Sequence, residues 1–255
     1  MDLLDLSPEE RMQLVGDLKT LEDFEGDEPE YILYTDAPKI IEETKKHKKR
    51  PLGIDSLDKI IEGVCSGELI IVTAPTGVGK TTLCQSITWN LANQNFPSLW
   101  YTLEVTLENF LTPFLNHDKE ASWEGDSLKK VSKWPIYFPK DVEKIDFNNL
   151  KRVIKYANVK HGVEHVFIDH LHYLISGKEM ASSKSTSLYI GDKLRQLRKI
   201  AHETGVSIFL VAHLHKIPEG EKPTINHMRD SSFIGQEADI VLVLWRDRLK
   251  QPVNK

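Results

Sequence analysis

The chain of 255 residues is 40% hydrophobic and 28% charged, which suits one sizeable globular domain with an appendage. Its formal net charge of −5 is uneven, because residues 1–30 hold 11 acidic and two basic residues while the remainder carries a net +4. This distribution excludes a general basic footprint for nucleic acid, so any such binding must come from local loops. Cys65 and Cys84 lack metal-site spacing, and no apolar run approaches the length of a membrane span. We therefore expect a reduced cytoplasmic protein without membrane association, from either a phage or a cellular host.

The first 50 residues are predicted to be distinct from the rest. The segment "SPEERMQLVGDLKTL" (7–21) has the capping box and apolar stripe of an amphipathic helix, and the acidic "EDFEGDEPE" (22–30) predicts a linker. A lone helix of this kind needs a partner surface, in its own domain or in a neighbouring subunit. The basic run "ETKKHKKRP" (43–51) favours a solvated helix end over an anion-binding patch, because charge runs are usually solvated.

From Gly53 onward, short apolar strands alternate with longer helical patterns. Strands are predicted over 68–74, 98–104, 136–139, 165–169, 207–213 and 239–245, and helices over 81–94, 106–117, 147–162 and 188–205. This alternation predicts an α/β fold with a mostly parallel central sheet flanked by helices. Such sheets bind ligands at the carboxyl ends of their strands. The biased stretch "SGKEMASSKSTS" (176–187) predicts a surface loop.

The loop after the first strand, "APTGVGKTT" (74–82), predicts a nucleotide site. It follows the phosphate-binding pattern G-x-x-x-x-G-K-[ST], except that Ala74 stands at the first glycine position. Backbone N–H groups of this loop would face phosphate oxygens, Lys80 would neutralise the β- and γ-phosphates, and the Thr81 hydroxyl would bind Mg²⁺. We expect ATP to contact Pro75, Thr76, Gly77, Val78, Gly79, Lys80, Thr81 and Thr82.

Two acidic residues at later strand ends complete this predicted site. Asp169 ends the strand "HVFID" and is expected to hold Mg²⁺ together with Thr81, although such an aspartate can also cap a helix. Glu104 ends "SLWYTLE" and is expected to orient the attacking water, the alternative being an ordinary surface glutamate.

Five blocks of the sequence, in order, resemble the RecA-type ATPase motor of ring-shaped replicative DNA helicases. They are "PLGIDSLDKIIEGVCSGELIIVTAPTGVGKTT", "LWYTLEVTLENFL", "VFIDHLHYL", "LRKIAHETGVSIFLVAHLHK" and "INHMRDSSFIGQEADIVLVLWRDR". Residues 51–248 are similar to the branch of phage primase-helicases and mitochondrial Twinkle, with the DnaB branch next. RecA-like recombinases share the first and third blocks, whereas "RDSSFIGQEAD" is typical of the helicases.

The resemblance implies roles for individual residues. Lys80 and Thr81 match the phosphate- and Mg²⁺-binding pair, Glu104 the general base and Asp169 the second acidic residue of the site. His213 matches a residue that senses the γ-phosphate and couples it to DNA. Arg229 and Gln236 match polar residues near the nucleotide and the DNA loop.

The resemblance also implies partners and domains. An N-terminal helix and linker would occupy residues 1–50, and a motor domain residues 51–255. Single-stranded DNA would thread a homo-oligomeric ring, a hexamer or heptamer, held by loops at 176–187 and 215–228. The expected phosphate contacts are Lys178, Lys184, Lys216 and Lys222. In the family, a segment with an arginine finger follows the last strand. No such motif is present in the sequence given, whose last residues are "RDRLKQPVNK". This leaves open a truncated chain, a finger supplied by a partner, or slow hydrolysis.

Two other functions remain open at this point. The segments "DHLH" (169–172) and "HLH" (213–215) could converge as a metal site for hydrolysis, although the helicase interpretation explains the same positions. The stronger rival is a RecA/KaiC-like regulatory or recombination ATPase that binds DNA without unwinding it. The missing finger favours this rival, and the last block opposes it.

Overall fold

The structure, a computed structural model, describes residues 49–117, 133–140, 146–170, 186–214, 221–224, 227 and 231–246. These residues belong to one compact unit, His47–Lys255. The predicted N-terminal helix (7–21) and linker lie outside the described residues. So do most of the loop 176–187 and much of the loop 215–228.

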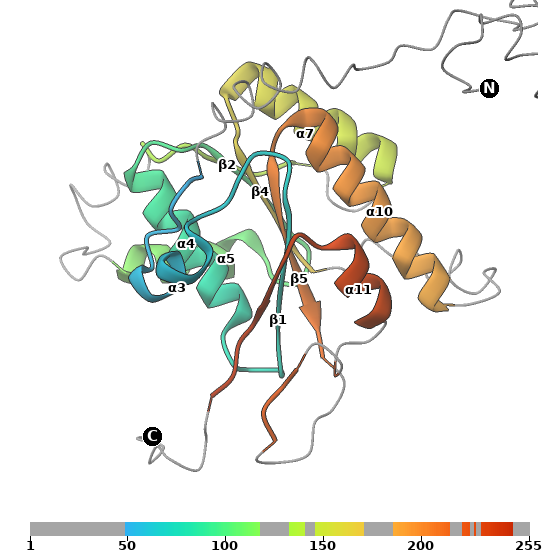
Figure 1. Cartoon of the computed structure of the whole chain (residues 1–255). Helices are drawn as coiled ribbons and strands as arrows, with labels where there is room; N and C mark the ends of the chain where they lie inside the picture. The colour runs from blue at the N-terminus through green and yellow to red at the C-terminus, as the bar shows by residue number, and fades with distance from the viewer. Residues whose placement is uncertain are drawn as a thin grey trace, which may run out of the picture. The chain divides into compact units, whose positions relative to one another are not determined.

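A six-stranded, entirely parallel sheet forms the centre of this unit (Figure 1). The strand order is β3-β2-β4-β5-β1-β6, so the chain crosses over between strands that are not consecutive. The strands are β1 (Leu69–Ala74), β2 (Ser98–Thr102), β3 (Ile136–Tyr137), β4 (His165–Asp169), β5 (Ser207–His213) and β6 (Ile240–Val243). Each falls within a predicted strand, and the predicted α/β class is confirmed.

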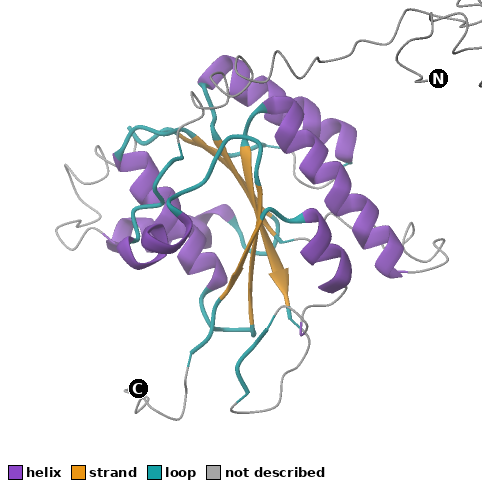
Figure 2. Ribbon diagram, in the orientation of Figure 1, coloured by secondary structure: helices purple, strands orange, loops and turns teal. Residues whose placement is uncertain are grey.

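Helices cover both faces of the sheet (Figure 2). One face carries α3 (Asp55–Ile61), α4 (Lys80–Asn93) and α5 (Leu107–His117). The other carries α7 (Phe147–His161), α10 (Thr186–Thr204) and α11 (Ser231–Glu237). The sequence patterns did not predict α3 or α11. The helix α10 begins at Thr186 and so includes the last two residues of the predicted loop 176–187.

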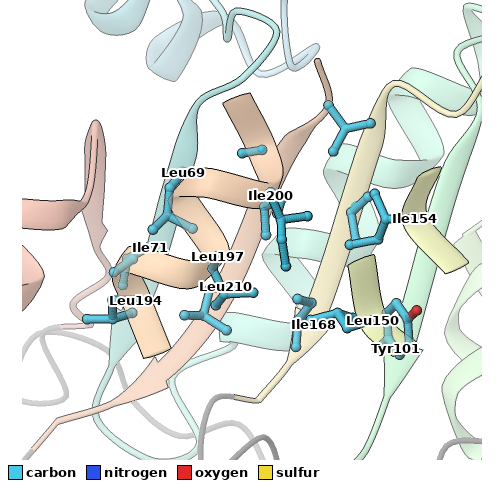
Figure 3. Close-up of a cluster of buried hydrophobic side chains, with 14 of the residues drawn as sticks. Leu69, Ile71, Tyr101, Leu150, Ile154, Ile168, Leu194, Leu197, Ile200 and Leu210 are labelled. Carbon is cyan, nitrogen blue, oxygen red and sulfur yellow. The ribbon is translucent and has the colours of Figure 1, made fainter. Parts of the chain in front are cut away.

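The sheet has a hydrophobic core on each face because successive residues of a strand point to opposite sides. Leu69 and Ile71 of β1 pack beneath α7 and α10 (Figure 3), whereas Ile70 and Val72 face α4 and α5. Such strands, buried on both faces, read as continuous apolar runs rather than as alternating ones. On the α4 face, the ring of Phe167 stacks between Trp100 and Phe209, with centroids 4.8 and 4.6 Å away.

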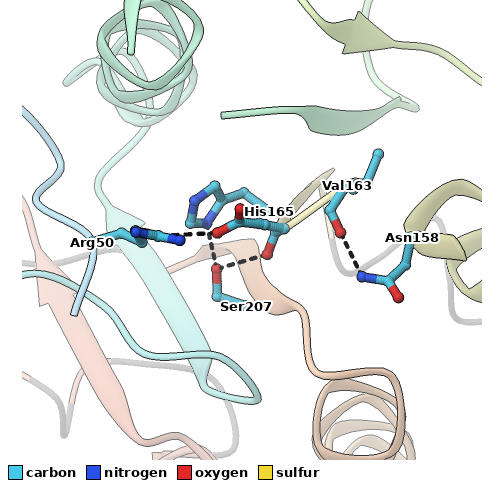
Figure 4. Close-up of polar contacts among 6 residues, drawn as sticks. Arg50, Asn158, Val163, His165 and Ser207 are labelled. Carbon is cyan, nitrogen blue, oxygen red and sulfur yellow. Dashed lines mark hydrogen bonds and ion pairs between the residues drawn. The ribbon is translucent and has the colours of Figure 1, made fainter. Parts of the chain in front are cut away.

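The amino edge of the sheet is fastened by polar contacts (Figure 4). Arg50 pairs in an antiparallel bridge with Val64, and its guanidinium lies 3.0 Å from the Glu164 carboxylate. His165 Nδ1 and Ser207 Oγ, on neighbouring strands, are 2.6 Å apart. The Arg50 contacts tie the segment before α3 to the amino ends of the strands, whereas the predicted site lies at their carboxyl ends.

Candidate nucleotide-binding site

The loop between β1 and α4 has the shape that phosphate binding requires. Ala74 is the last residue of β1, which explains why a glycine is not needed at that position. Gly77 and Gly79 both have positive φ, +76° and +109°, a conformation that glycine adopts without strain. Gly79 then caps α4, so the loop ends at a helix N-terminus, where N–H groups and the helix dipole favour an anion. Thr76, Gly77 and Thr82 are exposed, while Pro75 and Val78 are half-buried.

Lys80 starts α4 and turns its side chain back under the loop. Its Nζ donates to the carbonyl oxygen of Ala74 at 3.1 Å and lies 3.5 Å from that of Pro75. Burial lowers the pKa of Lys80, although the nearby carboxylates of Asp169 and Glu104 oppose this shift. The result is a cation held in a partly dry site, where its attraction for phosphate is stronger than in water.

The Thr81 hydroxyl donates a 2.7 Å hydrogen bond to Asp169 Oδ2. Asp169 is 3% exposed, and its second carboxylate oxygen, Oδ1, has no hydrogen-bond partner among the described residues. Burial raises the pKa of Asp169, and the bond from Thr81 partly offsets this effect. A hydroxyl and a carboxylate with a spare oxygen are the hard ligands that Mg²⁺ prefers, so the residues present fit that ion.

Glu104 lies two residues beyond the end of β2, not within the strand as predicted. Its segment is nevertheless fixed beside Asp169, because Leu103 N–H donates to the Asp169 carbonyl at 2.8 Å. Its side chain is 45% exposed, and its charge is near enough to influence the pKa values of Lys80, Asp169 and His213. An exposed carboxylate in this position is suited to contact water.

Two histidines stand beside Glu104. His170, directly after β4, has its Nδ1 3.3 Å from Glu104 Oε2, and its ring meets that of His213 edge to face with centroids 4.3 Å apart. Ligand atoms of the three side chains all lie within 4.8 Å of one another. Burial lowers the pKa of His213, and the positive charge of Lys80 adds to this effect. The sequence analysis assigned His170 no role in ATP hydrolysis and named it only as part of the rival metal motif "DHLH".

The remaining predicted residues are less completely placed. Gln236 is exposed on α11, where its carbonyl oxygen lies 3.5 Å from Arg198 Nη1 of α10. Lys222 is exposed, with its Nζ 5.2 Å from the ring centre of Trp245, just beyond β6. Because β6 runs parallel to β1, this contact and the phosphate loop both lie at the carboxyl ends of the strands. Arg229, Lys178, Lys184, Lys216, His172 and His215 lie outside the described residues.

Comparison with known proteins identifies relatives with similar sequences. The "Replicative DNA helicase DnaB" of Treponema pallidum is 25% identical over 214 residues, covering 77% of this chain and 48% of that protein. The protein of the same name from Helicobacter pylori strain J99 is 28% identical over 223 residues, covering 79% and 44%. The chain thus spans about half the length of the curated relatives it matches.

Two solved structures share the fold. One, described as an ATPase domain, superposes with a TM-score of 0.69 at 18% identity, covering 88% of this chain and 86% of that one. "The Structure Of A DnaB-Like Replicative Helicase And Its Interactions With Primase" gives a TM-score of 0.70 at 19% identity, covering 92% and 62%. Within the described part of the chain, we find no helix with the length and apolarity needed to cross a membrane.

A family profile described as "DnaB-like helicase C terminal domain" matches residues 51–255. The helicase-motor resemblance is thereby confirmed, while the preference for the primase-helicase and Twinkle branch stays a prediction. Because the match extends over most of its length, the chain belongs to the DnaB-like helicase C-terminal domain family.

Proposed function

We propose that the chain is an ATP-hydrolysing motor that moves along single-stranded DNA and unwinds duplex. The observation that carries this proposal is the 2.7 Å pair between Thr81 and Asp169 beside the buried Lys80, at a helix N-terminus. These three side chains supply a cation and two oxygen ligands where a Mg²⁺-bound triphosphate would lie. Bound Mg²⁺ would neutralise charge that develops on the phosphate oxygens.

Each residue has a separate task in the proposed reaction. The loop 74–81 orients the triphosphate through its N–H groups, and Lys80 attracts the β- and γ-phosphates. Glu104 orients a water molecule in line with the γ-phosphate and accepts its proton. His213, at the end of the neighbouring strand β5, contacts the γ-phosphate and responds to its loss. We propose that Arg229 and Gln236 lie near the nucleotide.

Movement along DNA would follow from the loop 215–228, which continues directly from β5 and His213. We propose that Lys178, Lys184, Lys216 and Lys222 contact DNA phosphates from two loops of each subunit. The exposed position of Lys222 at the sheet edge of the phosphate loop supports this assignment. The relatives are named as replicative DNA helicases, which supports DNA as the polymer along which the motor moves. We propose that the bound strand is single and that identical subunits assemble into a ring, a hexamer or heptamer.

We further propose that residues 1–50 form a separate N-terminal part, and that its helix packs on an adjacent subunit. The family match begins at residue 51, which agrees with this division. Lys49 and Arg50, near the start of the compact unit His47–Lys255, contact Glu62, Val64 and Glu164 of that unit.

A regulatory or recombination ATPase of the RecA/KaiC kind is the second candidate, since the phosphate site alone would serve it equally well. The match over residues 51–255 favours the helicase motor. A zinc hydrolase is the third. The support for it is that possible ligand atoms of Glu104, His170 and His213 lie close together, but a role in ATP hydrolysis explains the same residues.

The decisive experiment measures ATP hydrolysis with and without single-stranded DNA, together with native mass and unwinding of a forked duplex. A motor should hydrolyse ATP faster when DNA is present, assemble with nucleotide and separate the fork. DNA-stimulated hydrolysis without unwinding, by an assembled ring, would favour the regulatory ATPase. A hydrolytic activity that depends on zinc, in a protein that does not bind a nucleotide, would favour the zinc enzyme. Lack of ATP binding in the presence of Mg²⁺ would overturn the proposal.

A further inference from the structure

His170 stands between the proposed general base and the proposed phosphate sensor. Its side chain is 9% exposed, its Nδ1 lies 3.3 Å from Glu104 Oε2, and its ring contacts that of His213. We propose that His170 is a positioning residue, which holds the Glu104 carboxylate toward the attacking water and transmits the state of His213 to it. This inference rests on the proposed ATP hydrolysis and deepens it.

Glu104 needs such a support because its own surroundings restrain it little. It follows the end of β2, in a segment whose next residues are also exposed, and its side chain is 45% exposed. A glutamate side chain of this kind has several accessible rotamers, only some of which aim the carboxylate at a given water. Contact with a buried ring narrows this choice before the reaction begins, which lowers the cost of reaching the reactive geometry.

His170 is itself well fixed. It follows β4 directly, and β4 lies between β2 and β5 in the middle of the sheet. The ring of His213 meets it at an interplanar angle of 85°. An edge-to-face contact has a preferred geometry, so a shift of one ring displaces the other. The 3.3 Å approach of Nδ1 to Glu104 Oε2 lacks the alignment of a hydrogen bond. Contacts with a catalytic base often align fully only in the reacting complex.

The path from γ-phosphate to attacking water would therefore run through three side chains on adjacent strand ends. When the γ-phosphate is present, His213 would hold His170, and His170 would hold Glu104 in position. The arrangement would thus couple the position of Glu104 to the contact between His213 and the γ-phosphate.

Three variants test the proposal in the full chain. His170→Phe keeps a ring beside His213 but removes the polar atom that faces Glu104, whereas His170→Asn keeps a polar group near the position of Nδ1. The matched control is His165→Phe, at the other end of β4 and also buried. For each variant, kcat and KM are measured together with the affinity for a non-hydrolysable ATP analogue and the melting temperature.

We expect His170→Phe to lower kcat at least tenfold, with analogue affinity within twofold of the parent. His170→Asn should recover at least a third of the parental kcat, and His165→Phe should change the melting temperature but not kcat. In a Glu104→Gln background, His170→Phe should cause no further loss. Parental kcat in His170→Phe overturns the proposal, as does equal loss in His170→Asn or an additive loss in the double variant. If the parent binds no ATP, the proposed function fails instead.

Discussion

Thr81 and Asp169, 88 positions apart in the chain, are joined by a 2.7 Å hydrogen bond at the carboxyl edge of the sheet. The bond places the first turn of α4 against the end of β4 and partly compensates a carboxylate that is otherwise buried at a cost. Because Oδ1 has no hydrogen-bond partner among the described residues, this compensation is incomplete. Asp169 therefore carries a negative charge that destabilises the ligand-free fold but is available to bind a divalent cation.

This cost predicts an unusual outcome for Asp169→Asn. The pKa of Asp169 is raised by burial even with Lys80 and Thr81 nearby, so removing its charge should leave the free energy of unfolding of the ligand-free protein unchanged or increased. The same change removes a ligand that Mg²⁺ needs. For the parent, ATP and Mg²⁺ at about 100 times the dissociation constant should stabilise the fold by about 2.7 kcal/mol. Thermal melting with and without Mg²⁺–ATP should show that this gain is lost in the variant. The conservative change Thr81→Ser serves as control and should keep it, and a full ligand-induced shift in Asp169→Asn would contradict the assignment.

Glu104→Gln separates nucleotide binding from turnover. The substitution keeps the size of the side chain but removes the negative charge that accepts a proton from water. We expect the affinity for Mg²⁺–ATP to stay within a few-fold of the parent while kcat falls by about 10²–10⁴-fold. Glu108→Gln, on the exposed first turn of α5, is the matched control and should retain parental turnover. Unchanged kcat in Glu104→Gln would remove the residue from its proposed role.

Local chemistry explains why part of the structure was predictable. The strands β1, β4 and β5 are apolar runs buried on both faces, and the Gly79–Lys80–Thr81 sequence marks the start of α4, so all were predicted from their own residues. The confirmed parallel sheet follows from the alternation of these strands with helices. The ends of such strands meet at one edge, which is why Asp169 could be assigned to the site before its contact with Thr81 was known.

Relationships between distant segments were not predictable in the same way. The order β2-β4-β5-β1 decides which strand ends are neighbours, and no local pattern specifies it. This order brings His170 against both Glu104 and His213. The sequence suggested "DHLH" only as a rival metal motif, because the contacts of a histidine that follows a strand depend on tertiary packing. The short α11 was missed for a related reason, since it packs on α10 rather than repeating a long helical pattern.

Lys222 provides a test of the proposed DNA loop among the described residues. If its ammonium contacts one phosphate, Lys222→Ala should weaken binding of single-stranded oligonucleotides of any sequence. It should also reduce the slope of log affinity against log salt by about 0.7 per subunit. Lys59→Ala, which removes an exposed lysine on α3, should leave both quantities unchanged. Fluorescence anisotropy across a salt series measures them, and an unaltered slope in Lys222→Ala would exclude the contact.

His165 should make the stability of the motor domain depend on pH. Burial lowers the pKa of this histidine to about 3, and the positive charge of Arg50 adds to the effect. Its Nε2 has no hydrogen-bond partner among the described residues, so a proton there would have no acceptor. Below its ordinary pKa of 6.5, the unfolded chain binds a proton that the folded chain excludes, so stability falls as pH decreases.

The loss from this residue should amount to about 2 kcal/mol between pH 8 and pH 5, at about 1.4 kcal/mol per pH unit once below the unfolded pKa. Urea unfolding of the parent and of His165→Gln over this range isolates the contribution, because glutamine does not titrate. The variant is expected to be less stable at pH 8, since it loses the packing of the ring, but its stability should fall less steeply with acid. Parallel curves for the two proteins would show that His165 is protonated equally in both states, contrary to the buried, neutral ring at the amino edge.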